Sequence, residues 1–469
     1  MSDLGPSSTA SDLAAALRRR EISSSELLDA CLEAVDERNP TLNAMALRND
    51  EQARAGAAEA DRRLAAGEDA PFLGVPMPIK DLTPVAGWPV TFGSNGAPEG
   101  PSEESEMVVD AFVRAGFVLC GRTTTPAFGV ITATESTRYG LTRNPWDTQR
   151  TPGGSSGGAA AAVSSGMFPI AHANDGGGSI RIPASYCGLV GLKPSRGRVP
   201  RLSQSWLGAV VEGVVTRSVQ DAAAVLDVTS GPDACSWYNA PAPTRPFAAE
   251  LESPALRIGL MATAPLGIPT DPACSEAAQA AAELLEGLGH VIEPVEVASI
   301  SEEMVPPFVA LTQAGLADYE GVDWSQVEPH VAHGRAAAGE TSAYEYALAA
   351  KALERLSRRE VARWGRDFDV LLTPTSAVLP PIAGSVLEAQ HAAPDLPVPE
   401  VVASVSFTAF GNVSGLPAVS LPLHFTDENL PVGVQLTGGP WQEATLISLA
   451  AALERAAPWS QRRPALATA

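Results

Sequence analysis

Apolar positions near the N-terminus of the chain repeat at helical spacing. The apolar residues between positions 27 and 35 fall on one face of a helix, and Ser23-x-x-Glu26 immediately before them is a capping box. Asn39-Pro40 predicts the end of this helix, because proline lacks the N–H that a continuing helix needs. We therefore predict that residues 1–70 form a helical segment whose role is packing.

Between residues 74 and 218 the pattern changes to glycine-rich loops that alternate with short apolar runs. Residues 116–119 and 189–192 are such runs, and their length is typical of buried strands. Because strands of this kind often deliver functional loops to one place, we expect a catalytic core at about residues 71–225.

A strand, a helix and a second strand are predicted after this core. Residues 256–261 are mostly apolar, residues 276–288 are alanine-rich, and residues 291–297 return to an extended pattern. This order predicts the α/β class, with a sheet covered by helices.

Two later segments, residues 299–345 and 376–400, are rich in alanine, proline and acidic residues and show no clear period. We predict that they are surface excursions that shape or cover a pocket. The sequence contains no internal repeat, and we expect residues 1–469 to form a single domain.

The overall charge argues against nucleic acid as a direct ligand. The 469 residues carry a formal charge of −22 and the longest basic run is Arg18-Arg19-Arg20, so a phosphate backbone would be repelled. Residues 1–10 do not resemble a secretory leader, and no apolar run is long enough for a membrane span.

The five cysteines are scattered, odd in number and never spaced C-x-x-C. This arrangement disfavours a disulfide framework and a cysteine-rich metal site. We therefore expect a cytoplasmic protein that binds a small substrate, with neither nucleic acid nor membrane as a partner. A homodimer is left open.

Candidate chemistry lies in one lysine and two serines of the predicted core. Lys80 follows an apolar run, Ser155 lies in Gly153-Gly154-Ser155-Ser156-Gly157-Gly158, and Ser179 follows Gly176-Gly177-Gly178. A serine becomes a strong nucleophile when a neighbouring base takes its proton, and glycines allow backbone N–H groups to approach a reacting carbonyl. The pattern indicates a serine hydrolase whose base is a lysine.

The first glycine–serine motif also fits the G-x-S-x-G nucleophile elbow, with Ser155 as the nucleophile. An elbow needs a buried strand before it, but residues 147–152 are polar and end in proline. Residues 159–163 favour a helix, so we predict that the serines lie in a turn at a helix N-terminus. A purely structural turn is the alternative for this motif taken alone.

Lys80 would be a surface lysine in most contexts, but residues 73–79 before it are apolar. Burial beside such a run would lower its pKa towards neutrality, and a cationic neighbourhood would add to that effect. The glycines at 176–178 do not fit a phosphate-binding loop, which would need a lysine and a serine or threonine directly after them.

Two histidine positions are considered for other roles. His172, in the apolar run 167–173, is the rival base, although a buried core histidine is favoured. His330-x-x-His333 has no accompanying acidic residue, so a solvated helix face is favoured over a metal site. We expect neither a metal nor an organic cofactor.

Further motifs resemble those of the amidase-signature hydrolases over nearly the whole chain. Besides the lysine and the serines, the family order is matched by Arg143-Asn144-Pro145-Trp146-Asp147, GLVGLKP at 188–194, DVLLTPT at 369–375, GLPA at 415–418 and LPVGVQL at 430–436. The resemblance implies a large mixed central β-sheet covered by α-helices on both faces.

The resemblance also implies a role for each reacting residue. Ser179 would be the nucleophile, Ser155, preceded by a cis peptide bond, would bridge, and Lys80 would be the base. The oxyanion hole would consist of the N–H groups of Gly176, Gly177, Gly178 and Ser179. Supporting positions are matched by Ser156, Asp175 and Arg181.

The implied reaction is hydrolysis of C–N amide bonds, and of carbamate or ester bonds, in small and largely apolar substrates through an acyl-serine intermediate. The alternative is the A subunit of the glutaminyl-tRNA amidotransferase, which releases ammonia from glutamine. Residues 125–129 and Asn174-Asp175-Gly176 depart from that subunit and are similar to hydrolases of nylon-type cyclic oligomers, aryl amides and carbamates. A catalytically inactive binding module is disfavoured, because all three reacting residues are present.

Few aromatic residues are available to recognise a substrate. Aromatic side chains make up 6% of the chain, so one or two of them could dominate binding. We predict that Trp206, Phe128 and Tyr139 line the pocket.

Overall fold

The computed structural model describes residues 4–249, 254–297 and 300–467. Two predictions therefore fall partly outside the described residues. They concern residues 1–3 of the segment 1–10, which was compared with a secretory leader, and residue 299 of the segment 299–345. Among the helices that are described, none is both long and apolar enough to span a bilayer.

Eight strands form the main sheet. They are β6 (Ala171–Asp175), β7 (Val190–Lys193), β8 (Val211–Thr216), β9 (Arg257–Leu260), β10 (Val291–Pro294), β11 (Val370–Pro374), β12 (Ala418–Phe425) and β13 (Pro431–Gly438), in the spatial order β10-β9-β11-β13-β12-β7-β8-β6. Strands β9, β10 and β11 pair in parallel, whereas the pairs from β11 through β13 to β6 are antiparallel. The predicted mixed sheet is confirmed.

Two smaller sheets accompany the main one. Strands β1 (Met45–Arg48), β2 (Pro76–Lys80) and β3 (Val118–Thr123) form one in the order β1-β3-β2, and β4 (Glu135–Ser136) pairs with β5 (Gly140–Leu141). Strand β2 lies beside β6, so the residues at its end reach the main sheet.

Helices surround these sheets. The α-helices are α1 (Ala10–Arg18), α2 (Ser24–Leu42), α3 (Asp50–Ala65), α4 (Met107–Ala115), α5 (Gly157–Ser164), α6 (Arg181–Cys187), α7 (Ser205–Gly208), α8 (Val219–Thr229), α9 (Pro272–Gly287), α10 (Val305–Ala314), α11 (Pro329–Glu340), α12 (Ala343–Val361), α13 (Ser385–Ala392), α14 (Pro399–Val405), α15 (Ala409–Ser414) and α16 (Glu443–Ala456). The 3₁₀ helices are η1 (Ala127–Gly129), η2 (Gly315–Asp318) and η3 (Ala465–Ala467).

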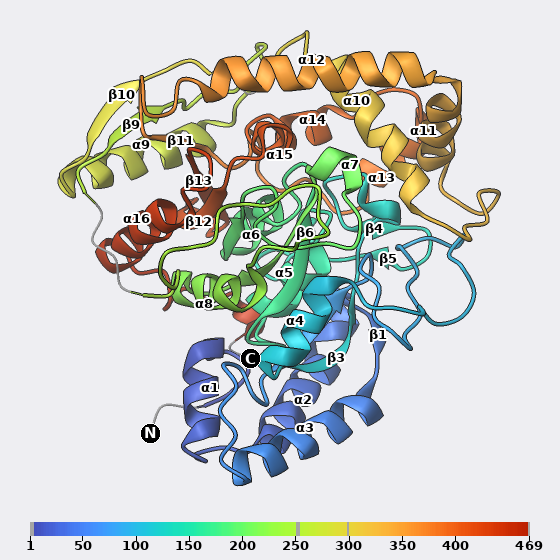
Figure 1. Cartoon of the computed structure of the whole chain (residues 1–469), viewed down its shortest axis with the longest axis vertical. Coiled ribbons are helices and arrows are strands. Elements are labelled where there is room, and N and C mark those ends of the chain that lie inside the picture. The colour runs from blue at the N-terminus through green and yellow to red at the C-terminus, as the bar shows by residue number, and fades with distance from the viewer. Residues whose placement is uncertain (1–3, 250–253, 298–299, 468–469) are drawn as a thin grey trace.

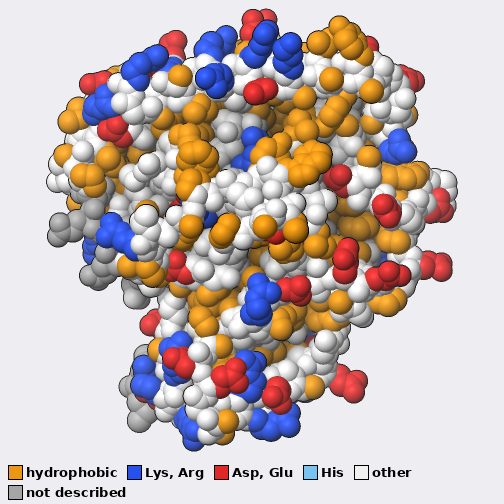
Figure 2. All heavy atoms as spheres, in the orientation of Figure 1, with side chains coloured by type: hydrophobic (Ala, Val, Ile, Leu, Met, Phe, Trp, Pro, Cys, Tyr) orange, Lys and Arg blue, Asp and Glu red, His pale blue; other side chains and the backbone are white. Residues whose placement is uncertain are grey.

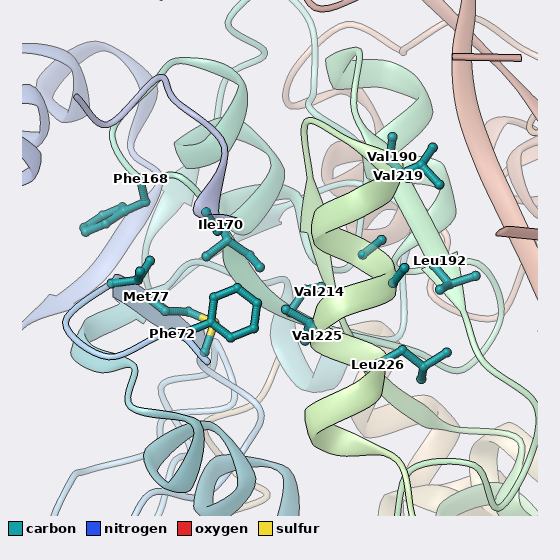
Figure 3. Packing of buried hydrophobic residues seen from close by; sticks show 14 of the residues in the cluster. Phe72, Met77, Phe168, Ile170, Val190, Leu192, Val214, Val219, Val225 and Leu226 are labelled. Carbon is teal, nitrogen blue, oxygen red and sulfur yellow. The ribbon is translucent and has the colours of Figure 1, made fainter. Parts of the chain in front are cut away.

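Both faces of the main sheet are covered, as predicted. On one face, Val219, Val225 and Leu226 of α8 pack near strands β7 and β8 (Figure 3). Side chains of adjacent residues in a strand point to opposite faces. Val214 of β8 accordingly belongs to this cluster, and its neighbour Val215 packs with α5 and α6 on the other face.

The N-terminal helices α1, α2 and α3 form one end of the molecule, and α12 lies across the opposite end (Figure 1). Helix α2 begins after Ser23 with the predicted capping box. It continues past Asn39-Pro40, however, and ends at Leu42. Leu42 is buried, and the left-handed backbone of Asn43 closes the helix through a hydrogen bond from its N–H to the Asn39 carbonyl.

The predicted strand, helix and strand correspond to β9, α9 and β10, and the two strands pair in parallel. The segments 299–345 and 376–400, in contrast, are more regular than their composition suggested. Helices α10, α11 and α13 form there because contacts with α12 and with one another hold them, although their apolar residues show no clear helical period.

Candidate active site

Lys80, the last residue of β2, lies at the centre of a buried polar cluster. Its side-chain nitrogen Nζ is 2.8 Å from Ser155 Oγ and donates a hydrogen bond of 2.7 Å to Asn174 Oδ1. No part of the lysine is exposed, and Ser155 is 2% exposed. The structure therefore brings together a lysine and a serine that are 75 positions apart in the sequence.

Ser155 lies in the predicted turn before α5, and the Gly154–Ser155 peptide bond is cis, as the resemblance implied. Thr134 holds this turn: its hydroxyl donates to the Gly153 carbonyl and accepts from the Gly157 N–H. A Cβ atom on Gly157 would overlap the Thr134 side chain, so this position requires glycine. The strand before this turn, β5, ends at Leu141, so no strand leads directly into the turn and the nucleophile-elbow alternative is wrong.

Ser179 follows β6 and shares a cavity wall with Ser155. Within the described part of the chain, its hydroxyl makes no hydrogen bond, and neither do the N–H groups of Gly176, Gly177 and Ser179. The Gly178 N–H differs, because it donates to Asp175 Oδ1 at 2.8 Å. Gly178 therefore does not provide the free oxyanion donor predicted for it, and three donors remain.

Asp175 and Arg181 support this turn from behind. Both are fully buried and form a two-pronged ion pair with distances of 2.9 Å. Asp175 also accepts hydrogen bonds from the backbone of Gly178 and Ile180, and the charge of Arg181 holds its pKa well below the usual range against the opposing effect of burial. The predicted Ser156 is close by and donates to the Asn174 carbonyl.

The C-terminal half of the chain completes this support. Asn412 in α15 donates to Asp175 and accepts from Arg181, and Gln435 in β13 accepts from Arg181. Sequence reasoning missed both residues and also Asn174. Gln435 lies in the motif LPVGVQL and Asn174 in Asn174-Asp175-Gly176, so their motifs were noticed but their roles were not.

Burial lowers the pKa of Lys80 to about 7, which agrees with the predicted direction. The expected cationic neighbourhood is wrong, because the charged groups that act on Lys80 are the carboxylates of Glu212 and Asp175, and both raise its pKa. Desolvation outweighs them, since Lys80 has no contact with solvent. The amine is therefore available as a neutral base near neutral pH.

His172 is engaged on both sides of its ring. Its Nδ1 accepts a hydrogen bond from the Lys80 backbone N–H, and its Nε2 lies 2.9 Å from a carboxylate oxygen of Glu212. A ring nitrogen that accepts a hydrogen bond carries no proton, so the imidazole proton of His172 lies on Nε2. His172 is thus a fully buried structural histidine that positions the backbone of Lys80.

Two cavities meet at Ser179. The smaller, of about 160 Å³, is lined by Ser155, Ser179 and the polar residues Glu106, Arg201 and Asp318. The larger, of about 410 Å³, is mostly apolar, and helices α10, α11, α13 and α14 contribute to its wall. Residues of both predicted excursions line it. Their helices therefore shape a pocket beside Ser179.

Two of the three predicted pocket aromatics are in place. Trp206 and Phe128 line the smaller cavity, and Trp206 also lines the larger. Tyr139 lines neither, so this prediction is wrong. Its hydroxyl instead hydrogen bonds to Thr91 and Asp81 behind the site, and Asp81 directly follows Lys80.

His330 does not lie on a solvated helix face as predicted. It is 8% exposed, because α11 packs against α13, whereas His333 on the next turn is exposed. Among the described residues there is no group of three or more His, Cys, Asp or Glu side chains that could hold a metal ion.

Comparisons with known proteins agree with this site. The family model described as Amidase matches residues 26–447. The 6-aminohexanoate-cyclic-dimer hydrolase of Pseudomonas sp. (strain NK87) is 35% identical over 486 residues, an alignment that covers 96% of this chain and 95% of that protein.

Solved structures show the same similarity. The structure of a 6-aminohexanoate cyclic dimer hydrolase complexed with substrate has a TM-score of 0.91 and 32% identity, and the match covers 98% of this chain and 99% of that one. A bacterial aryl acylamidase of the amidase signature family has a TM-score of 0.87 and 27% identity, with 97% of each chain covered. These similarities favour a free-standing hydrolase over an amidotransferase A subunit.

Proposed function

Because the chain belongs to the amidase family, we propose that it hydrolyses C–N amide bonds of small, largely apolar substrates through an acyl-serine intermediate on Ser179. The observation that carries this proposal is the buried contact of 2.8 Å between Lys80 Nζ and Ser155 Oγ, beside a cavity that Ser155 and Ser179 share. A lysine with a pKa of about 7 in that position can take a proton at neutral pH.

In the proposed reaction, neutral Lys80 takes the proton of Ser155, which takes the proton of Ser179. The Ser179 oxygen then forms a bond to the substrate carbonyl carbon. The negative charge that develops on the carbonyl oxygen is stabilised by the free N–H groups of Gly176, Gly177 and Ser179.

The tetrahedral intermediate collapses when the C–N bond breaks. An amine leaves only when its nitrogen is protonated, so Ser155 gives it a proton that Lys80 replaces. Water activated by the same relay then attacks the acyl-serine, releases the carboxylic acid and restores the Ser179 hydroxyl.

The two cavities indicate which half of the substrate each receives. Ser155 must reach the leaving nitrogen, and Ser155 lines only the smaller, polar cavity. We therefore place the amine half there and the acyl half in the larger, apolar cavity. An apolar acyl group would be desolvated in that cavity, which favours binding.

The names of the similar proteins support amides of two kinds as substrates, cyclic oligomers of 6-aminohexanoate and aryl amides. We propose that linear, cyclic and aryl amides are accepted, together with carbamates and esters that have the same carbonyl geometry. No metal or organic cofactor takes part in this chemistry.

We also propose that the chain acts without a nucleic-acid partner in a reducing, cytoplasmic compartment. The net charge of −22 supports the first point, since it opposes tRNA binding. The second is supported by the five cysteines, all of which are free thiols.

The nucleophile can be tested on the purified chain with a fluorophosphonate probe and an aryl amide substrate. We expect the probe to label Ser179, and Ser179→Ala to abolish both labelling and turnover while the melting temperature stays close to that of the wild type. Peptide mapping that finds the probe on Ser155, with Ser179 unmodified, would contradict the assignment.

The substrate class needs a separate assay. Anilides, aliphatic amides, esters, carbamates and glutamine should be compared at equal concentration, with hydroxylamine added to divert the acyl group to a hydroxamate. We expect anilides to be good substrates, glutamine to be poor, and hydroxamate to form. Glutaminase activity that appears only with added partner subunits would favour the amidotransferase alternative.

A further inference from the structure

The smaller cavity carries two carboxylates that the proposed reaction does not use. Glu106, directly before α4, and Asp318, the last residue of η2, line it together with Ser155 and Ser179. Glu106 is 5% exposed, whereas Asp318 is exposed to solvent. Within the described part of the chain neither carboxylate forms a hydrogen bond with the two serines, so both are available to a substrate.

One arginine also lines this cavity, but its charge is already compensated. Arg201 Nη2 lies 3.2 Å from Glu212 Oε1 and 3.8 Å from Glu106 Oε2. Glu212 is fully buried and does not line the cavity. It therefore balances Arg201 from outside, and the cavity itself keeps the negative charge of Glu106 and Asp318.

The two carboxylates are incompletely satisfied. Glu106 Oε1 accepts hydrogen bonds from the backbone N–H groups of Met107 and Leu202, but Oε2 accepts none among the described residues. Burial raises the pKa of Glu106, and the charge of Arg201 opposes this effect only in part. Asp318 forms no ion pair with any described residue. A cation brought into the cavity would stabilise the charge of both.

Aromatic rings form another part of the same wall. Phe92, Phe128 and Tyr319 line the cavity and pack together, with ring centroids 4.8 Å apart for Phe92 and Tyr319 and 4.9 Å apart for Phe128 and Tyr319. Aromatic rings and carboxylates both attract organic cations. This combination suits an ammonium group on an apolar chain and opposes a carboxylate.

From this wall we propose that Glu106 and Asp318 select amides whose amine half is a diamine, so that the leaving amine carries a second, positively charged amino group. This inference rests on the proposed function, which places the amine half in the smaller cavity. The apolar chain of the diamine would contact the aromatic wall, and its ammonium group would be attracted by the two carboxylates. Amides whose leaving amine is an ω-amino acid are disfavoured by the same charges.

Three amides with one common acyl group test the proposal. Their amine chains have equal length and end in an ammonium, a methyl or a carboxylate group, and the length is varied over the series. At about pH 8 Lys80 is neutral, whereas an alkylammonium with a pKa of about 10.4 is charged. At the best length we expect kcat/KM of the ammonium substrate to exceed that of the methyl substrate at least about threefold and that of the carboxylate substrate at least about tenfold.

Variants then assign this preference to the two carboxylates. Asp318→Asn and Glu106→Gln keep the size of the side chain and remove its charge, and each should reduce the ammonium-to-carboxylate ratio of kcat/KM about threefold or more. Glu320→Gln is the matched control, because Glu320 is exposed two residues after Asp318 and lines neither cavity. This variant should keep the wild-type ratio.

Two outcomes would overturn the inference. One is a wild type that hydrolyses the three substrates equally well, or the carboxylate substrate best, at every chain length. The other is an unchanged ratio in Asp318→Asn and in Glu106→Gln. If Glu106→Gln does not fold, the wild-type series and Asp318→Asn, at an exposed position, still decide the question. Failure of the proposed function would be seen separately, because none of the three substrates would then be hydrolysed.

Discussion

Lys80 combines complete burial with a contact to the hydroxyl that it is proposed to deprotonate. Its two nearby carboxylates, Glu212 and Asp175, favour the charged form, yet its pKa still falls to about 7. Asp175 already forms an ion pair with Arg181, and Glu212 forms one with Arg201 and a hydrogen bond with His172. Pairing of the carboxylates leaves desolvation as the larger effect on the lysine.

The role of Lys80 predicts a pH profile. Only the neutral amine accepts a proton, so kcat/KM should rise with pH through about 7 and reach a plateau in the alkaline range. Lys80→Arg keeps a cation that does not deprotonate in a protein, and we expect it to lose activity on the order of 10²–10⁴-fold, as Lys80→Met should.

Two controls accompany this prediction: the thermal stability of the Lys80 variants, and a substitution of His172, the rival candidate for the base. Melting temperatures should show that both Lys80 variants fold, and His172→Gln should keep the same alkaline limb because His172 does not touch the reacting serines. An active Lys80→Arg, together with a His172→Gln variant that loses the limb, would identify His172 as the base.

At the level of elements, the turn between β6 and α6 places Ser179 and the free N–H groups side by side. Gly177 and Gly178 are neighbours in this turn but differ in backbone and surroundings. Gly178 has a φ of +138°, and a Cβ there would overlap the Thr408 hydroxyl and come within 2.7 Å of Ile182. A Cβ on Gly177 would meet no atom closer than 3.9 Å.

This difference predicts that two alanine substitutions affect stability to different extents. Gly178→Ala should lower the free energy of unfolding by at least about 1–3 kcal/mol. A residue with a side chain is strained at that φ, and the new Cβ would overlap the buried side chains of Thr408 and Ile182. Gly177→Ala should leave it nearly unchanged. Urea unfolding of the two variants measures both values, and equal losses would show that the turn is not held as the contacts indicate.

At the scale of the whole molecule, charge is distributed unevenly between surface and interior. The net charge is −22, yet Lys and Arg side chains gather along the rim formed by α12 (Figure 2). Inside, a second lysine, Lys193 of β7, is also fully buried, and burial together with Arg181 lowers its pKa to about 7. The folded protein therefore contains two lysines that are neutral at pH values at which the same lysines would be protonated in the unfolded chain.

This difference predicts how stability depends on pH. Above about pH 7 the unfolded chain binds more protons at these lysines than the folded chain does, so the free energy of unfolding should rise with pH. The rise should be clearest between about pH 7 and about pH 8.5, before the buried thiols, whose pKa values are raised, begin to act in the opposite direction.

Urea unfolding at the two ends of this interval measures the effect. Lys193→Met removes one of the two lysines while keeping an apolar chain of similar length, and the rise should be smaller in this variant. A free energy of unfolding that falls over the interval in the wild type would contradict the assignment of neutral buried lysines.

Local features of the fold follow from the sequence alone. The capping box at Ser23, the glycine-rich turn before α5 and the succession of strand, helix and strand at β9, α9 and β10 were predicted because each depends on residues close together in the chain. The order of the family motifs likewise identified Lys80, Ser155 and Ser179 as the candidate catalytic residues.

Only the tertiary structure decided which distant side chains meet. The hydrogen bonds that Asn174 makes to Lys80, and that Asn412 and Gln435 make to Arg181, are examples. They depend on the order of strands in the sheet and on the docking of α15. The same packing directed the Tyr139 hydroxyl to Asp81 and buried His330, whose ring nitrogens have no hydrogen-bond partner among the described residues. Periodicity and spacing describe neighbours along the chain, whereas these contacts join residues from separate elements, and their formation depends on how the whole core packs.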